Sequence, residues 1–176
     1  MPLTRLERAE KLYFAGKPAA ARRLYEREAT APSPDHRLFM RIAMTFYEEG
    51  RHEDALEWNS RGLHLAPGCP LLLCDRAAIL EAAGRPVDAI EAYQELVKLG
   101  PERIAEQTCS RGLPWAKGLV NDCLYRQAAI YRRLGEHGQA ARLLTEHLKG
   151  RIYGTESVYS DDEVQTALDA ALSLTG

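Results

Sequence analysis

The sequence predicts an all-α fold, a right-handed α-solenoid of about four helix-turn-helix units followed by a C-terminal capping helix. Three glycines, Gly16, Gly50 and Gly84, lie 34 residues apart. A series of small residues and a pair of prolines keep the same 34-residue step. These are Ala21, Ala55 and Ala89, with Pro67 and Pro101. A fixed period of this length is typical of stacked helical repeats, in which each unit buries its apolar side against its neighbours.

The second unit shows the expected order of elements. One apolar stripe at helical spacing predicts its first helix. The stripe consists of Phe39, Ile42, Ala43 and Phe46. Gly50 is expected to end that helix in the left-handed conformation, and Pro67 is expected to stop the second helix. Small residues at Ala9, Ala43, Ala77 and Ala128 occupy the corresponding position of each first helix.

The units are predicted to form a single array over residues 1–176, with boundaries at about 2–34, 36–68, 70–101 and 121–150. The turn glycine of the fourth unit, Gly135, follows Gly84 by 51 residues rather than 34, so residues 102–120 are predicted to be an insertion. Ser160 and Glu163 have the spacing of a capping box, which predicts a capping helix over about 160–174. Its apolar stripe is expected to cover the last exposed face of the stack.

These residues resemble the tetratricopeptide repeat family. Phe39-x-x-Ile42-Ala43-x-x-Phe46 is similar to the first half of the family pattern, and Ala89-x-x-x-Tyr93 with Pro101 to the second. The resemblance covers about residues 2–150. Five positions depart from the pattern because a polar or charged residue replaces an apolar or aromatic one. They are Arg5, Arg8, Asn59, Arg76 and Gln127.

Composition argues against several classes of function. The formal net charge of the 176-residue chain is −2 and its charges are mixed, so nothing draws it to nucleic acid or to an anionic membrane. The charged start does not look like a signal peptide, and no apolar run is long enough to cross a bilayer. The four cysteines lack any C-x-x-C spacing, which favours a reducing, cytoplasmic environment over a zinc or redox site.

No catalytic residues, metal ligands or cofactor are expected. The five histidines are scattered and share no local spacing. His52-Glu53 lacks the second histidine of a metalloprotease helix. Paired acid and base groups at helical spacing are also missing, so the chain is not predicted to be an enzyme.

The resemblance implies that the first helices of successive units line a concave groove that binds a partner. The predicted partner-binding side chains are those off the core stripe: Tyr13, Arg37, Met40, Arg41, Met44, Tyr47, Asp75, Tyr125, Arg126 and Arg133. Methionines suit an adaptable surface, and arginines can fork onto a partner's carboxylates. The alternative is that Met40 and Met44 pack between adjacent units as core.

The expected partner is another protein, bound as an extended peptide or as a helix. The resemblance also implies roles such as assembly adaptor or secretion-type chaperone. A branch of the family binds acidic chaperone tails through a clamp of lysine, asparagine and arginine, and neither possible register supplies that clamp. In the first register its positions hold Leu6, Glu10, Arg41, Leu71 and Asp75. The alternative function is a structural scaffold that works by homo-oligomerisation.

Overall fold

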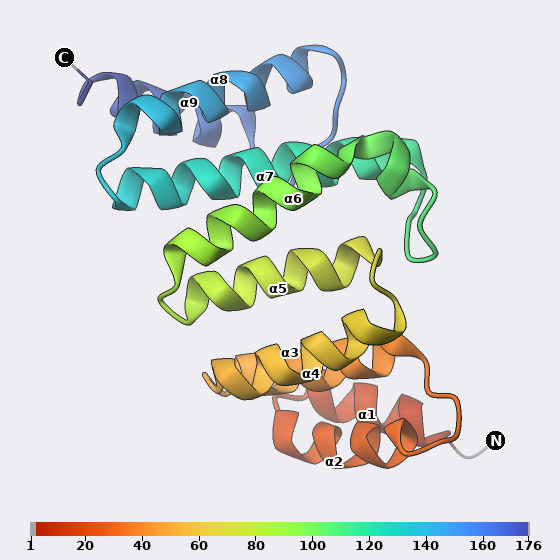
Figure 1. Cartoon of the computed structure of the whole chain (residues 1–176). Coiled ribbons are helices and arrows are strands. Elements are labelled where there is room, and N and C mark those ends of the chain that lie inside the picture. The colour runs from red at the N-terminus through yellow and green to blue at the C-terminus, as the bar shows by residue number, and fades with distance from the viewer. Residues whose placement is uncertain (1–2, 176) are drawn as a thin grey trace. The chain divides into compact units, whose positions relative to one another are not determined.

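The computed structural model describes residues 3–175, and in that range it consists of helices joined by turns and short loops (Figure 1). The helices are α1 (Arg5–Phe14), α2 (Pro18–Ala29), α3 (His36–Glu48), α4 (His52–Leu65), α5 (Pro70–Ala82), α6 (Pro86–Ala105), α7 (Leu113–Arg133), α8 (His137–Ile152) and α9 (Asp161–Leu172). The all-α prediction is confirmed. Residue 2, where the first repeat is predicted to begin, lies outside the described residues.

The chain divides into two compact units, Met1–Gly84 and Arg85–Gly176, which we call unit 1 and unit 2. Unit 1 contains α1 to α5 and unit 2 contains α6 to α9. The helix pair predicted over 70–101 is therefore split, with α5 in unit 1 and α6 in unit 2. The single array over the whole chain stays a prediction.

In unit 1 each helix packs against the next one along the chain. The core stripe predicted on α3, from Phe39 to Phe46, is buried. Ala9, Ala43 and Ala77 are each at most 1% exposed, so the small residues of the period lie where helices approach closely. Gly50 ends α3 with a φ of 71°, as predicted, in a conformation that costs other residues free energy.

The departures from the repeat pattern have physical reasons in the structure. Asn59 is fully buried, and its Nδ2 donates a hydrogen bond to the Leu72 carbonyl oxygen at 2.9 Å, which joins α4 to α5. Gln127 is also buried and donates to the Cys123 carbonyl of its own helix. Arg5 and Arg76 are exposed, and Arg5 forms an ion pair with Glu28 of α2.

Unit 2 begins with a helix in two pieces. Gly100 has φ 78° and ψ 157° and interrupts α6, and the helix resumes at Pro101 and ends at Ala105. Pro101 thus starts a second piece rather than closing the unit, and this piece extends into the predicted insertion over 102–120. The long α7 then begins at Leu113 with Pro114 in its first turn, where a proline needs no N–H partner.

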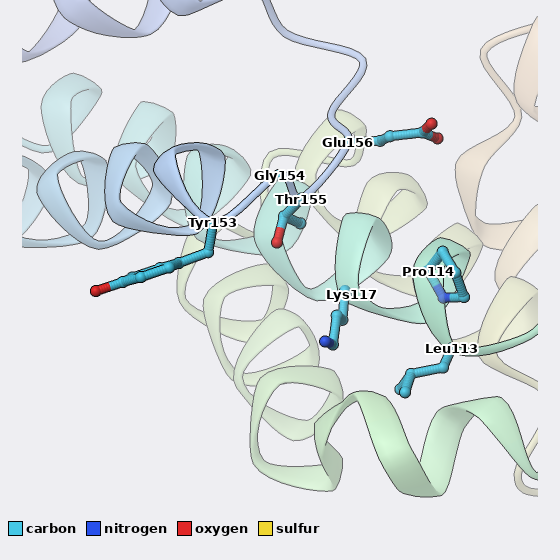
Figure 2. Close-up of a pocket in the computed structure, with 7 residues that line it drawn as sticks. All are labelled: Leu113, Pro114, Lys117, Tyr153, Gly154, Thr155 and Glu156. Carbon is cyan, nitrogen blue, oxygen red and sulfur yellow. The ribbon is translucent and has the colours of Figure 1, made fainter.

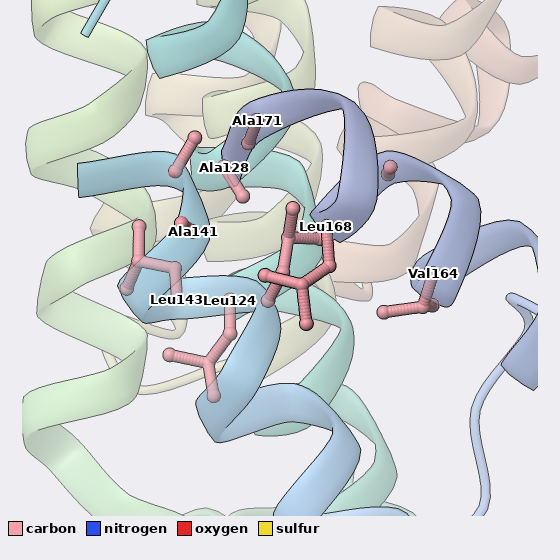
Figure 3. Close-up of a cluster of buried hydrophobic side chains, with 10 residues drawn as sticks. Leu124, Ala128, Ala141, Leu143, Val164, Leu168 and Ala171 are labelled. Carbon is pink, nitrogen blue, oxygen red and sulfur yellow. The ribbon is translucent and has the colours of Figure 1, made fainter. Parts of the chain in front are cut away.

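The helix α9 packs on α8 and buries Val164, Ala167, Leu168 and Ala171, as predicted for a capping helix (Figure 3). The Ser160 hydroxyl accepts a hydrogen bond from the Glu163 amide at 3.2 Å. The second half of the expected capping box is wrong, because the Glu163 carboxylate instead accepts a hydrogen bond from Tyr125 of α7. Leu172, at the end of α9, is 53% exposed.

Candidate partner-binding surface

In unit 1, side chains of α1 and α3 meet through two polar contacts. The Arg41 guanidinium pairs with the Glu10 carboxylate at 2.7 Å. The Tyr13 hydroxyl donates a hydrogen bond to Glu48 Oε1 at 3.1 Å. Glu10 and Glu48 were not among the predicted site residues, because a contact between two helices has no signal in the local sequence.

Met40 and Met44 lie on the same side of α3 as these contacts. The spacing of Arg41, Met44 and Glu48 places them on one stripe of the helix, and Met40 is one turn from Met44. Both methionines are half-buried, whereas the neighbouring core stripe is buried. A half-buried methionine leaves flexible apolar surface for another molecule to contact.

Asp75 of α5 faces the same region. Burial, the charge and hydrogen bond of Glu48 and, more weakly, the charge of Asp75 together raise the pKa of Tyr13 to about 12. Asp75 is itself half-buried, and burial raises the pKa of its carboxyl to about 7. Within residues 3–175 no hydrogen bond or ion pair reaches Asp75.

These contacts and spacings bring six side chains of three helices to one side of unit 1. We call them the unit 1 surface: Tyr13, Met40, Arg41, Met44, Glu48 and Asp75. Five of the six were predicted from the sequence. The surface contains apolar, aromatic and ionic groups, and such a mixture is suited to binding a polypeptide.

Two other predicted residues of unit 1 lie at the margin of this surface. Arg37 is in the first turn of α3, and its Nε lies 3.8 Å from Asp35, which also caps the helix by accepting the Arg37 amide. Tyr47 is half-buried, packs against the core cluster of unit 1, and has its ring centroid 5.9 Å from that of His52. The Tyr47 ring therefore also contributes to the core.

The remaining predicted residues, Tyr125, Arg126 and Arg133, belong to α7 of unit 2. The two arginines are exposed. The Tyr125 ring is stacked on the Tyr159 ring, with centroids 3.8 Å apart, and its hydroxyl donates to Glu163 at 3.0 Å. The chain itself therefore contacts both the ring face and the hydroxyl of Tyr125.

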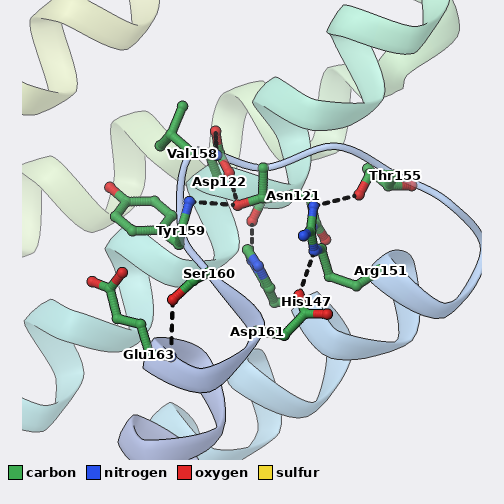
Figure 4. A network of polar contacts seen from close by, with 11 residues as sticks. Asn121, Asp122, His147, Arg151, Thr155, Val158, Tyr159, Ser160, Asp161 and Glu163 are labelled. Atoms are coloured by element: carbon green, nitrogen blue, oxygen red, sulfur yellow. Dashed lines mark hydrogen bonds and ion pairs between the residues drawn. The ribbon is translucent and has the colours of Figure 1, made fainter.

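Tyr159 belongs to the segment between α8 and α9, which a polar network fastens to α7 (Figure 4). Asp122 of α7 accepts from the Ser157 hydroxyl and from the Val158 amide. Arg151 pairs with Asp161 at 2.6 Å and donates to the Thr155 carbonyl at 3.0 Å.

A buried histidine lies beneath this network. His147 of α8 is fully buried, and its Nδ1 lies 2.9 Å from the Asn121 carbonyl oxygen. Burial lowers the pKa of His147 and raises that of the neighbouring Asp122. The contact between His147 and Asn121 joins α7 to α8 beside the segment between α8 and α9, so it stabilises the end of unit 2.

Unit 2 also has a small pocket of about 260 Å³ (Figure 2). It is lined by Leu113, Pro114, Lys117, Tyr153, Gly154, Thr155 and Glu156. Sequence patterns do not indicate this pocket, because the first turns of α7 and the turn after α8 lie about 40 residues apart and meet only in the fold. It has one lysine and one glutamate and no buried acid–base pair.

The comparisons with known proteins agree with this fold. A family model described as tetratricopeptide repeat matches residues 6–70. A crystal structure of MamA protein is similar with a TM-score of 0.72 at 15% identity, and the match covers 98% of this chain and 81% of that chain. A tetratricopeptide repeat protein from Parabacteroides merdae has a TM-score of 0.71 at 16% identity, with 98% of this chain and 59% of that chain covered.

A second MamA structure has a TM-score of 0.63 at 16% identity, with 95% of this chain and 94% of that chain covered. At such identities the likeness shows the fold alone, and it confirms the predicted class, an all-α solenoid. No curated protein matches the sequence. Among the described helices, none combines the length and the apolar character that crossing a membrane requires.

Proposed function

Because this chain belongs to the tetratricopeptide repeat family through its residues 6–70, we propose that it is a non-catalytic module that binds another protein through the unit 1 surface. The ligand is an extended peptide or a helix of the partner. The adaptor and secretion-chaperone roles implied by the family stay predictions, and so does the cytoplasmic location.

One observation supports this proposal above the others: α3 has apolar residues on two stripes. The first stripe is buried in the core of unit 1, and the second, with Met40 and Met44, is half-buried. A helix that only had to pack in a core would need a single apolar stripe. Met44 of the second stripe lies between Arg41, which pairs with Glu10, and Glu48, which accepts the Tyr13 hydroxyl, and this combination of apolar and charged groups is typical of a binding surface.

The proposal is tested by replacing Arg41 and Met44 with alanine together. Partners of the wild-type chain are first captured by cross-linking in native cells and identified by mass spectrometry. The double variant is expected to weaken binding of the identified partner by more than about 2 kcal/mol, which is about thirtyfold in affinity. Its melting temperature should fall only slightly, because an exposed ion pair such as Arg41 with Glu10 contributes about 0–1 kcal/mol.

A matched control replaces Arg23 and Leu65, an exposed arginine and an exposed leucine of unit 1, with alanine. The control is expected to bind like the wild type. If the Arg41/Met44 variant loses most of its thermal stability while its folded fraction binds normally, Met44 belongs to the core and the proposed surface is wrong.

The second candidate function is a scaffold built by self-association. Leu172 and Leu174, at and just beyond the end of α9, are 53% and 62% exposed, and exposed apolar ends of repeat stacks can pair. Light scattering over a wide concentration range distinguishes the two functions. A chain that stays monomeric throughout excludes the scaffold.

A further inference from the structure

We propose that the partner segment presents a lysine or arginine side chain, set among apolar residues, to the Glu48 and Asp75 carboxylates of the unit 1 surface. This inference rests on the proposed function and specifies the chemistry of the ligand. It also reverses the expectation from the sequence, in which arginines of the protein recognise carboxylates of the partner.

The argument begins with the charges that are already paired. The Arg41 guanidinium pairs with Glu10 at 2.7 Å, so its charge is largely neutralised inside unit 1. Arg37 lies beside Asp35 at the start of α3. Neither arginine is an unpaired cation that would attract an acidic segment.

The two remaining carboxylates have no cation. Glu48 accepts the Tyr13 hydroxyl, and within residues 3–175 it forms no ion pair. Asp75 has no hydrogen-bond or ion-pair partner in the same range. Both lie close enough to Tyr13 for their charges to raise the pKa of its hydroxyl. The part of the surface around Tyr13 is therefore acidic, because both carboxylates act on it.

An acidic partner would bring like charges together there, which costs free energy, whereas a cation would be attracted. The absence of a nearby cation within residues 3–175 is reflected in the pKa of the Asp75 carboxyl. Burial raises the pKa of its carboxyl to about 7, and no positive group opposes this shift. A cation from the partner would favour the ionised carboxylate and form a charge-assisted hydrogen bond with it.

The apolar part of the ligand follows from the methionines. Met40 and Met44 are half-buried one turn apart on α3, next to the acidic centre. Apolar side chains of the partner would cover them, while the aliphatic stem of a lysine or arginine passes over them and its charged end reaches the carboxylates. The ligand is thus an amphipathic basic segment.

The test uses short random peptides displayed on phage and selected near neutral pH against the immobilised full chain. A parallel selection uses the Asp75→Asn/Glu48→Gln variant, which keeps the shape of both side chains. We expect the wild type to enrich peptides with lysine or arginine next to apolar residues. The variant should still select peptides but without this basic preference.

The most enriched wild-type peptide is then synthesised for affinity measurements by fluorescence anisotropy. Its Kd should rise about tenfold or more with the double variant, as expected for loss of charge-assisted contacts. It should change little with Glu53→Gln/Glu57→Gln, which removes two exposed acids of α4. Replacing the basic residue of the peptide by glutamine should weaken binding to the wild type but not to the Asp75/Glu48 variant.

The outcomes separate the two proposals. Peptides selected without a basic preference, or an equal preference with the double variant, would overturn the inference and leave the proposed function standing. Equal loss with the α4 control would show attraction to the net charge of the protein and would also overturn it. If no peptide is selected, or if Met44→Ala binds the selected peptide unchanged, the proposed function itself fails.

Discussion

The most direct physical test of the unit 1 surface is the stability of the Asp75→Asn variant as a function of pH. Burial raises the pKa of the Asp75 carboxyl from 3.8 to about 7 in the folded protein. Between these two values the folded state binds a proton that the unfolded state has released. Raising the pH through this window therefore lowers the free energy of unfolding of the wild type. Asparagine does not titrate, so the variant lacks this contribution.

The size of the effect follows from the shift. A displacement from 3.8 to about 7 corresponds to about 4 kcal/mol, and this is an upper value because solvent at a half-buried site reduces it. Near pH 4 the variant and the wild type should differ little, since the wild-type carboxyl is protonated in the folded state. By about pH 8 the variant should be the more stable protein by about 1–4 kcal/mol.

Urea denaturation followed by circular dichroism at several pH values measures this difference. Only the difference between variant and wild type is interpreted, because the other titrating groups are common to both proteins. The matched control is Glu57→Gln, an exposed acid of α4, whose curve should run parallel to that of the wild type. If Asp75→Asn also runs parallel to the wild type from acid to alkaline pH, Asp75 is well solvated or paired, and the argument for an uncompensated carboxylate is refuted.

Two further predictions concern packing. A methyl group added at Gly62 of α4 would lie 3.0 Å from Leu72 Cδ1, so Gly62→Ala should lower the free energy of unfolding by about 1–2 kcal/mol in the urea assay. A methyl group added at Gly138 meets nothing within 4 Å, so Gly138→Ala should raise the free energy of unfolding by up to about 1 kcal/mol in the same assay. A shift of the same sign in both variants would contradict the close approach of α4 to α5. Tyr159→Ala removes the ring stacked on Tyr125 and should increase amide hydrogen exchange over 161–172, measured by mass spectrometry; unchanged exchange there would show that the stack does not hold α9.

Much of the fold could be predicted because the repeat pattern is local. Gly50 marks a helix end by its backbone conformation, and Ala9 and Ala43 mark close helix contacts by their size. These properties depend on neighbours within one helix pair, which the 34-residue period repeats. The kink at Gly100 was missed because Pro101 fits two patterns, the end of one helix and the start of another.

The candidate site was predictable only in part. The period places Met44 and Asp75 on the first helices of their units, and the structure puts both on the unit 1 surface. It does not reveal that Glu10 neutralises Arg41, because that contact joins residues of two helices through their side chains. Tyr125 shows the same limit, since its contacts come from Tyr159 and Glu163, more than 30 positions away. Composition and spacing therefore predict which side chains lie on the surface, but they do not show which of its charges are already paired.

The hydrogen bond from Tyr125 to Glu163 has a consequence for the cooperativity of unit 2. In a linear stack each element contacts only its nearest neighbours, so the last helix can open without disturbing anything beyond the adjacent one. Here the first turn of α9 is hydrogen-bonded to α7, which precedes α8 in the chain. Arg151 of α8 also forms an ion pair with Asp161 in the same turn of α9. Opening α9 thus breaks contacts with two helices at once, which makes the three helices a single cooperative unit rather than a fraying end.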